Sequence, residues 1–330
     1  MKVAILTEGG RARGLGHVVR CLSLRFAFLE SGAECEMFID GDDALGSVMS
    51  GAPWRCLHWV SDAEIIRAVV GAADIVVIDS YLAAQNVYDV VAESKKLAMF
   101  FDDTRRLLYP CGYVVNASAE STGTGYPPRQ GVKYCLGPDY ICLRREFWDL
   151  TPFLVRPDIK RVFLSFGAVD SKNILGRVLG ACVSARPDLT YLAVVGPATR
   201  KGLSLLEAYE NVQSVEFLRD VSVNRLISAM QSVDVAVSSC GQTIYELAKT
   251  GVPSVTVRAH ENQYLTWQMM VSSGAVCDGG AVNETLEGRV LAALQAMQAP
   301  SLRQVCQDSG CRLVDGQGAR RIVSILLKGK

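Results

Sequence analysis

The fold is decided by the stretch Gly14-Leu15-Gly16-His17-Val18-Val19-Arg20. An apolar run over residues 3–7, typical of a buried strand, precedes it, and apolar residues then recur at three- and four-residue steps up to Leu29. A strand, a glycine loop and a helix are how a parallel α/β sheet presents backbone N–H groups to an anion. His17, one of only three histidines, stands where the helix begins. The sequence therefore predicts that His17 either takes part in chemistry or merely caps and packs the helix.

Polar residues also follow the next predicted strands of the first half. Asp79-Ser80-Tyr81 ends the strand that starts at residue 74, Asp102-Asp103 follows the strand over 96–101, and Asn116 ends the strand over 112–116. In a parallel sheet these strand ends share one edge with Gly14–His17. Asp and Asn are common turn formers, so one such residue alone indicates little. Because four polar strand ends coincide, we expect this edge to be a ligand site.

Composition and charge exclude several classes of function. The 330 residues suffice for two domains, and 49% apolar with 21% charged residues is an ordinary globular composition. Lys+Arg and Asp+Glu balance at 34 each, so neither nucleic acid nor an anionic membrane is an expected partner. No apolar run approaches the roughly 20 residues of a membrane span, and no signal-peptide pattern opens the chain. We expect a cytoplasmic protein without stable membrane insertion, with a monomer favoured.

Metal and disulfide chemistry are not expected. The eleven cysteines are scattered singly with no C-x-x-C pair, which favours reduced and mostly buried thiols. The adjacent carboxylates Asp102 and Asp103 can bind Mg²⁺ in principle, but such pairs more often cap a turn and hydrogen-bond sugar hydroxyls. The sequence therefore predicts no metal site and no cofactor.

The second half repeats the α/β pattern of the first. Prolines at 152 and 157 mark a linker, so we expect domains over 1–150 and 151–330, with the last helix (319–327) free to pack back on the first domain. A short helix is expected over 43–49, and the Ser-, Thr-, Gly- and Pro-rich segment 117–130 is predicted to be a loop. Two parallel sheets with polar strand ends make a cleft between two domains the expected ligand site.

The clearest motif of the second half runs from Ser238 to Glu246. Small residues, among them Ser239, Gly241 and Thr243, mark a turn from a strand into a helix, where backbone N–H groups and the helix dipole suit a diphosphate. Glu246, one helical turn on, can accept both hydroxyls of a ribose. The alternative is a plain helix cap followed by a surface glutamate. Neither a Walker A loop nor a dinucleotide fingerprint is present.

Several motifs along nearly the whole chain carry a resemblance. They are the Gly14–Arg20 stretch, Asp79-Ser80-Tyr81, Asp102-Asp103, Gly137-Pro138-Asp139-Tyr140 with Leu143-Arg144-Arg145-Glu146-Phe147, Gly167 with Asp170, and Ser239 to Glu246. In this order they resemble the pseudaminic-acid-pathway UDP-sugar hydrolases and the related spore-coat polysaccharide proteins. The resemblance implies a GT-B fold with two Rossmann-like domains facing a cleft, in which the C-terminal domain holds the nucleotide and the N-terminal domain faces the sugar.

The resemblance also implies an activity. Enzymes of that family remove UDP from UDP-2,4-diacetamido-2,4,6-trideoxy-β-L-altropyranose by inverting attack of water at the anomeric carbon. Carried over, His17 is the general base, and the start of a helix is expected to keep its imidazole neutral near pH 7. Tyr81 positions the sugar or the water, and the backbone of Leu218 reads the uracil edge. The remaining substrate-binding residues implied are Gly14, Gly16, Arg20, Asp103, Asn116, Gly167, Ser239, Gly241, Gln242, Thr243, Glu246, Asn262 and Gln263.

One position departs from the family pattern, and two other functions stay open. Ala168 stands where relatives usually have a second glycine, which the turn accommodates if Ala168 has a negative φ. A GT-B glycosyltransferase using a UDP-sugar donor would share the fold but needs an acceptor groove. A nucleotide-sugar-binding protein without catalysis is the third reading, against which the intact His17 and Tyr81 argue.

Overall fold

The computed structural model describes residues 1–328 except 11–12, 43–44, 47–48, 50–51, 119–124, 197–198 and 200–201. The helix predicted over 43–49 and the loop predicted over 117–130 both include residues outside this described part. The chain divides into two compact units, of which the first comprises Met1–Arg145 and Gln317–Lys330 and the second Glu146–Gly316. Residues 146–150, expected at the end of the first domain, lie in the second unit, where Trp148 packs against Gly316.

The first unit holds a seven-stranded parallel sheet with the strand order β3-β2-β1-β4-β5-β6-β7. Its strands are β1 (Lys2–Gly9), β2 (Glu34–Gly41), β3 (Trp54–Cys56), β4 (Ile75–Asp79), β5 (Leu97–Phe101), β6 (Gly112–Asn116) and β7 (Val132–Leu136). Its helices are α1 (Gly16–Glu30), α2 (Ala63–Ala72), α3 (Gln85–Glu93) and α11 (Gly318–Lys328), with short 3-10 turns η2 (Pro138–Tyr140) and η3 (Arg145–Phe147), the last of which crosses into the second unit.

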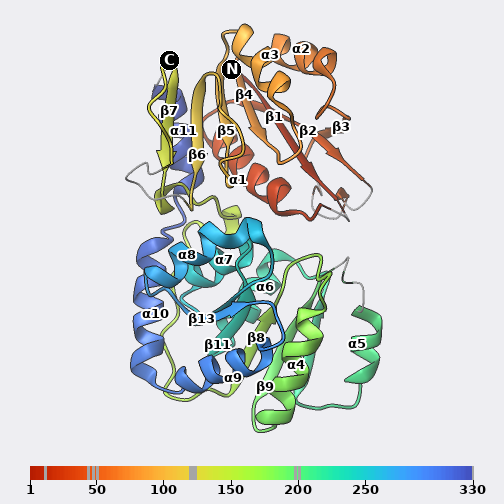
Figure 1. Cartoon of the computed structure of the whole chain (residues 1–330), viewed down its shortest axis with the longest axis vertical. Coiled ribbons are helices and arrows are strands. Elements are labelled where there is room, and N and C mark those ends of the chain that lie inside the picture. Colours follow the sequence, from red (N-terminus) through yellow and green to blue (C-terminus); the bar gives the residue numbers. More distant parts are fainter. Residues whose placement is uncertain are drawn as a thin grey trace. The chain divides into compact units, whose positions relative to one another are not determined.

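Alternation along the strands divides the core of the first unit between two faces. Leu6 and Ile78 lie in a cluster with Ile66 of α2 and Val87 of α3, so these two helices cover one face. Helix α1 packs on β1 and β2 from the other face, and α11 packs against α1. In Figure 1 the blue terminal helix α11 accordingly lies among the red-to-yellow elements of the first unit.

The second unit holds a six-stranded parallel sheet with the strand order β10-β9-β8-β11-β12-β13. Its strands are β8 (Arg161–Ser165), β9 (Thr190–Val195), β10 (Val215–Arg219), β11 (Val235–Ser239), β12 (Ser254–Arg258) and β13 (Val276–Ala281). Its helices are α4 (Ile174–Ala185), α5 (Gly202–Ala208), α6 (Val223–Gln231), α7 (Gln242–Thr250), α8 (Tyr264–Ser272), α9 (Leu286–Ala296) and α10 (Pro300–Leu313), with a 3-10 turn η4 (Glu261–Gln263). Helices α4 and α9 share one core cluster with the sheet. Both helices are labelled in Figure 1.

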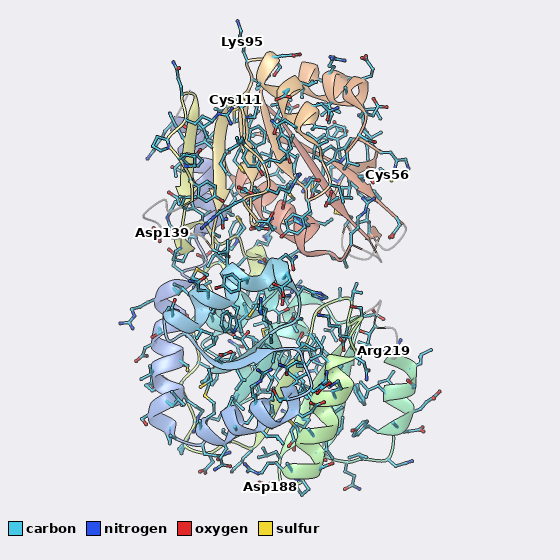
Figure 2. The ribbon with its side chains drawn as sticks, in the orientation of Figure 1. Cys56, Lys95, Cys111, Asp139, Asp188 and Arg219 are labelled. Carbon is cyan, nitrogen blue, oxygen red and sulfur yellow. The ribbon has the colours of Figure 1, made fainter. Side chains whose placement is uncertain are left out.

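The prediction of two Rossmann-like parallel sheets is confirmed, with small differences at strand ends. Strand β3 is short and ends at Cys56, and His58 lies beyond it with an exposed side chain. The eleven cysteines are free thiols and most are buried, while Cys56, labelled in Figure 2, is exposed.

A buried carboxylate fixes the start of the second sheet. One oxygen of Asp234 accepts hydrogen bonds from the backbone N–H groups of Lys160 and Arg161 at 2.7 and 2.8 Å. Asp234→Ala leaves both donors unsatisfied, so we expect a free energy of unfolding lower by about 1–3 kcal/mol in urea denaturation. Asp188→Ala is the control, because exposed Asp188 (Figure 2) pairs with Arg186 at the surface and should leave the unfolding midpoint unchanged.

Candidate active site

Helix α1 brings His17 to the carboxyl edge of the first sheet. The loop before it is closed by two reciprocal backbone hydrogen bonds between Gly10 and Gly14, at 3.0 and 2.8 Å. Gly14 has a φ of +79°, a conformation that favours glycine, and the helix begins two residues later at Gly16. His17 therefore lies in the first turn of α1, and its side chain retains 12% exposure. Most of the ring is therefore buried, and a small part of it is exposed.

The imidazole of His17 is paired with Asp79 at the end of β4. Its Nδ1 lies 2.6 Å from Oδ1 of Asp79, which is itself buried. Since an ionised carboxylate only accepts hydrogen bonds, this contact places a proton on Nδ1 and directs Nε2 away from Asp79. The sequence pointed to Asp79 as a polar strand end and did not include it among the functional residues. The signal was its position on the edge that also holds His17.

The pKa of His17 differs in direction from the sequence expectation. Burial lowers the pKa of the ring, but the charge and hydrogen bond of Asp79 outweigh burial and the nearby Arg20, so the net pKa lies above its ordinary value. The helix start was expected to keep the imidazole neutral, and a carboxylate at 2.6 Å outweighs that dipole. The pKa of Asp79 moves downward, because Arg20 and His17 outweigh the opposing effect of burial.

Arg20, one turn along α1, joins two strand ends. Its Nε and Nη2 donate to Asp79 at 2.8 and 2.6 Å, and its Nη1 and Nη2 donate to Asp103 at 2.8 and 2.9 Å. The guanidinium also lies over the ring of Phe101, 4.2 Å from its centroid. Bidentate pairing to two carboxylates fixes both the arginine and the acids that follow β4 and β5.

Tyr81 completes this cluster from the segment after β4. Its hydroxyl donates to Oδ2 of Asp103 at 2.8 Å, and its ring stands edge-on to the ring of His17 with centroids 4.3 Å apart. Burial, with the neighbouring Asp103, raises the pKa of Tyr81, so the phenol stays protonated at neutral pH. The backbone N–H of Tyr81 donates to Glu8, a buried residue near the end of β1. Glu8 is not among the functional residues predicted from the sequence.

Asn116 lies in a second polar group on the same sheet. Its Nδ2 donates to the hydroxyl of Tyr126 at 2.8 Å, and that hydroxyl donates to Oδ2 of Asp102 at 3.0 Å. Asp102 also accepts from the backbone N–H of Arg105, which is the turn-capping role weighed for it in the sequence. The side chain of Asn116 is fully buried, with its oxygen accepting from Ser118 N–H.

The predicted phosphate turn of the second unit forms at the start of α7. Gly241 is the residue before the helix, with no side-chain cap, and Ser239 ends β11 in a buried position. Gln242 and Thr243 are the first two residues of α7, where backbone N–H groups point outward from the helix end. Glu246 is fully buried, which excludes the surface glutamate of the alternative reading.

Gln263 is aimed at this turn. Its Oε1 accepts from the backbone N–H of Ala259 at 2.9 Å, which leaves its Nε2 3.9 Å from the place where a Cβ on Gly241 would lie. The side-chain amide therefore adds a donor beside the N–H groups of α7. Asn262 precedes it in η4 and is exposed.

The other predicted residues of the second unit lie at strand ends. Gly167 follows β8 with a φ of +89°, and Ala168 is not among the non-glycine residues with positive φ, so the condition set for its methyl group is met. Asp170 accepts from the N–H groups of Ile174 and Leu175 and so caps α4. Leu218 lies near the end of the edge strand β10 with a buried side chain.

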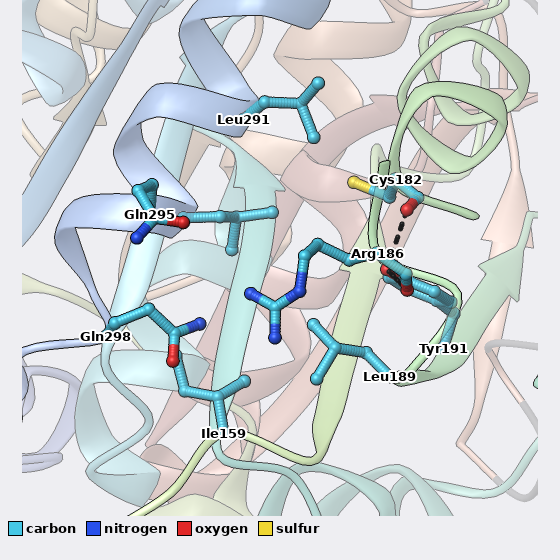
Figure 3. Close-up of a pocket in the computed structure, with 9 residues that line it drawn as sticks. Ile159, Cys182, Arg186, Leu189, Tyr191, Leu291, Gln295 and Gln298 are labelled. Carbon is cyan, nitrogen blue, oxygen red and sulfur yellow. Dashed lines mark hydrogen bonds between the residues drawn. The ribbon is translucent and has the colours of Figure 1, made fainter. Parts of the chain in front are cut away.

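A pocket of the second unit lies away from these residues. Figure 3 shows it lined by side chains of α4 and α9 and by residues at the amino ends of β8 and β9, such as Ile159 and Leu189. The dashed line there marks the hydroxyl of Tyr191 donating to the carbonyl of Cys182 at 2.9 Å. Within the described residues, no group of three His, Cys, Asp or Glu side chains is placed to hold a metal ion. No helix in that part of the chain has the length and apolarity to cross a membrane.

Solved structures place this architecture in a known class. MnaA of S. aureus, in a co-structure with UDP, superposes with a TM-score of 0.71 at 10% identity, covering 99% of this chain and 96% of that one. MurG of Acinetobacter baumannii superposes with a TM-score of 0.65 at 12% identity, covering 99% and 100%. The chain therefore has the GT-B fold, as predicted.

Curated relatives are similar at low identity, and no protein-family model matches the chain. The spore coat polysaccharide biosynthesis protein SpsG of Bacillus subtilis is 22% identical over an alignment 339 residues long, which covers 99% of this chain and 98% of SpsG. An uncharacterised protein of Methanocaldococcus jannaschii is 24% identical over 276 residues, 80% of this chain and 57% of its own length. The Helicobacter pylori pseudaminic acid cytidylyltransferase and UDP-2,4-diacetamido-2,4,6-trideoxy-beta-L-altropyranose hydrolase is 23% identical over 279 residues, 83% of this chain and 47% of its own length. The chain thus spans about half the length of the last two relatives.

Proposed function

We propose that this chain is a GT-B enzyme of surface polysaccharide biosynthesis that acts on a UDP-sugar and hydrolyses it. Water attacks the anomeric carbon with inversion and UDP departs. The proposed substrate is UDP-2,4-diacetamido-2,4,6-trideoxy-β-L-altropyranose or a close amino sugar, as in the name of the H. pylori relative. Similarity to SpsG along the whole chain and the UDP bound in MnaA support a nucleotide-sugar substrate.

The observation that carries the proposal is the His17–Asp79 pair. With the proton of the ring held on Nδ1 by Asp79, the Nε2 of His17 is the unprotonated nitrogen that takes a proton from water. As the oxygen of water bonds to the anomeric carbon, the bond from that carbon to the phosphate oxygen breaks, and its electron pair leaves with UDP. General-base help of this kind contributes on the order of 10²–10⁴-fold in rate.

The start of α7 is the proposed diphosphate site. UDP is a good leaving group, so stabilising its developing charge is enough and no strong acid is required. Backbone N–H groups of Gln242 and Thr243, the helix dipole behind them and the Nε2 of Gln263 all favour an anion at this turn. Glu246, one turn into the helix, is the proposed acceptor for the ribose hydroxyls, a role that rests on the resemblance described above.

Incubation of the full chain with a panel of UDP- and CMP-linked sugars, without an acceptor, tests the proposal by NMR of the products. We expect free UDP and a reducing amino sugar whose first-formed anomer has inverted configuration. Transfer that occurs only when an acceptor is added would overturn hydrolysis in favour of the glycosyltransferase alternative. Binding of the nucleotide sugar without turnover under either condition would favour the binding protein.

Gly241→Val tests the phosphate turn without disturbing the fold. Gly241 has a φ of −94°, and a Cβ placed on it meets only Gln263 at an ordinary contact distance of 3.9 Å. The Cβ of a valine therefore meets no close atom, and its methyl groups stand where a phosphate would approach the backbone. We expect the Kd for UDP, measured by calorimetry, to rise at least about tenfold, the effect of losing roughly 1.4 kcal/mol. The control is Gly288→Val, at an exposed position of α9 with open space around it; an equal loss of affinity in both variants would remove the turn from binding.

A further inference from the structure

Glu8 is a buried carboxylate for which the proposed chemistry has no use. It is 3% exposed, near the end of β1, and its two oxygens receive different donors. Oε1 accepts the backbone N–H of Tyr81 at 2.9 Å, and Oε2 accepts the hydroxyl of Ser80 at 2.5 Å. Burying a charged carboxylate costs free energy, and hydrogen bonds offset only part of that cost. Both of its hydrogen bonds are made to the segment that carries Tyr81.

These contacts fix the whole turn after β4. The hydroxyl of Ser80 donates to Glu8 and accepts from the backbone N–H groups of Leu82 and Ala83 at 3.0 and 2.9 Å. The side chain of Glu8 therefore joins the end of β1 to four consecutive residues, 80–83. Removing it leaves the hydroxyl and one N–H group without their acceptor.

Tyr81 is held at its other end by a second carboxylate. Its hydroxyl donates to Asp103, and its ring lies edge-on to His17 at an interplanar angle of 89°. A single hydrogen bond from Nδ1 to Asp79 anchors one side of the imidazole and still lets the ring tilt about that bond. The Tyr81 ring, perpendicular to the imidazole with its centroid 4.3 Å away, blocks that tilt, so the direction of Nε2 depends on where Tyr81 is held.

We propose that Glu8 is a positioning residue for His17, acting through the backbone of Tyr81. Its kinetic consequence rests on the proposed function, since it concerns the aim of the base at water. A base displaced by about 1 Å loses on the order of 10²-fold in rate. The structural consequence, a fixed orientation of the His17 ring, is independent of any substrate.

The substrate-independent test is NMR of the three imidazoles in the full chain labelled with ¹⁵N-histidine. The His17 signals are assigned by their loss in His17→Asn. In Glu8→Ala we expect the His17 ring protons to shift in the same direction as in Tyr81→Leu, because the aromatic edge moves away or is removed. Glu8→Gln keeps a carbonyl oxygen for the Tyr81 N–H, so its His17 signals should lie closer to wild type. Asp234→Asn, a buried carboxylate of the other unit, is the control that should leave them unchanged.

The result that overturns the proposal is a His17 spectrum in both Glu8 variants identical to wild type, with the Tyr81→Leu spectrum shifted. A cooperative thermal unfolding transition shows that a variant is folded, and Glu8→Gln, nearly isosteric, keeps the test valid if Glu8→Ala does not fold.

The kinetic test follows UDP release. In Glu8→Ala we expect kcat to fall on the order of 10²-fold with KM within about twofold of wild type, and Glu8→Gln to restore most of it. The acid limb of the pH profile should stay close to its wild-type position, because the main charges that act on the pKa of His17 are those of Asp79, Arg20 and Asp103 rather than Glu8. A raised KM at unchanged kcat would make Glu8 a substrate-binding group and overturn the positioning role. If wild type releases UDP from no sugar, the proposed function fails while the NMR result still decides the role of Glu8.

Discussion

His17→Asn is expected to lower kcat for UDP release on the order of 10²–10⁴-fold while leaving the Kd for UDP unchanged. The asparagine amide can still donate to Asp79, so the carboxylate keeps a partner, but the variant has no nitrogen that accepts a proton from water. Binding is spared because the proposed UDP site lies in the second unit, at the start of α7. Initial rates of UDP release and calorimetric titration with UDP measure the two quantities.

The matched control is His58→Asn. His58 is exposed and contacts Asp40 rather than Asp79, so the same substitution there should leave both quantities at their wild-type values. A His17→Asn enzyme within about threefold of the wild-type rate would remove His17 from the mechanism.

Asp79→Asn is the second large effect expected. The neutral amide loses the charge that orients His17 and that pairs with Arg20, so the proton on Nδ1 and the aim of Nε2 are no longer fixed. We expect kcat to fall on the order of 10²–10⁴-fold in initial-rate measurements. The fold should persist, since Arg20 retains its bidentate pairing with Asp103.

The same substitution should move the pH profile. A general base works when it is unprotonated, so the wild-type rate is lost as the pH falls through the pKa of His17. Burial lowers this pKa, but Asp79 raises it more, so the net pKa lies above the ordinary value of histidine. Without the Asp79 charge that pKa falls, and the acid limb of kcat/KM should shift to lower pH in Asp79→Asn. Asp102→Asn is the control, because buried Asp102 lies on the same sheet edge and is not among the main groups that shift the pKa of His17. A profile that shifts equally in both variants would contradict the pairing.

The position of the candidate site was predictable because parallel strands end on one edge. The pattern of apolar strands followed by polar residues marked Asp79, Tyr81 and Asp103, and in the structure these three meet His17 and Arg20. Which of them pair was not predictable. Arg20 joins acids 59 and 83 residues away, and that choice depends on rotamers and on the ring of Phe101 beneath the guanidinium.

Glu8 and β13 are two further features that could not be predicted from the local sequence. Because glycines follow Glu8 directly, the apolar pattern places the end of the first strand before it. In the structure Glu8 belongs to β1, pairs with Asp40 in the strand register and has a buried side chain. Strand β13 contains Gly279 and Gly280, residues that favour turns, and its register with β12 shifts between Thr256 and Arg258. The strand forms because β12 offers it an edge, which is a tertiary contact that local sequence does not record.

The placement of α11 has a consequence for the order in which the nascent chain folds. The second unit, Glu146–Gly316, is continuous in the chain and is translated before α11 (Gly318–Lys328). The first unit has all its strands by then, but the face of α1 that α11 covers stays bare until residues 318–328 emerge. The packing of the unit that carries His17 is therefore completed only after the whole second unit has been translated.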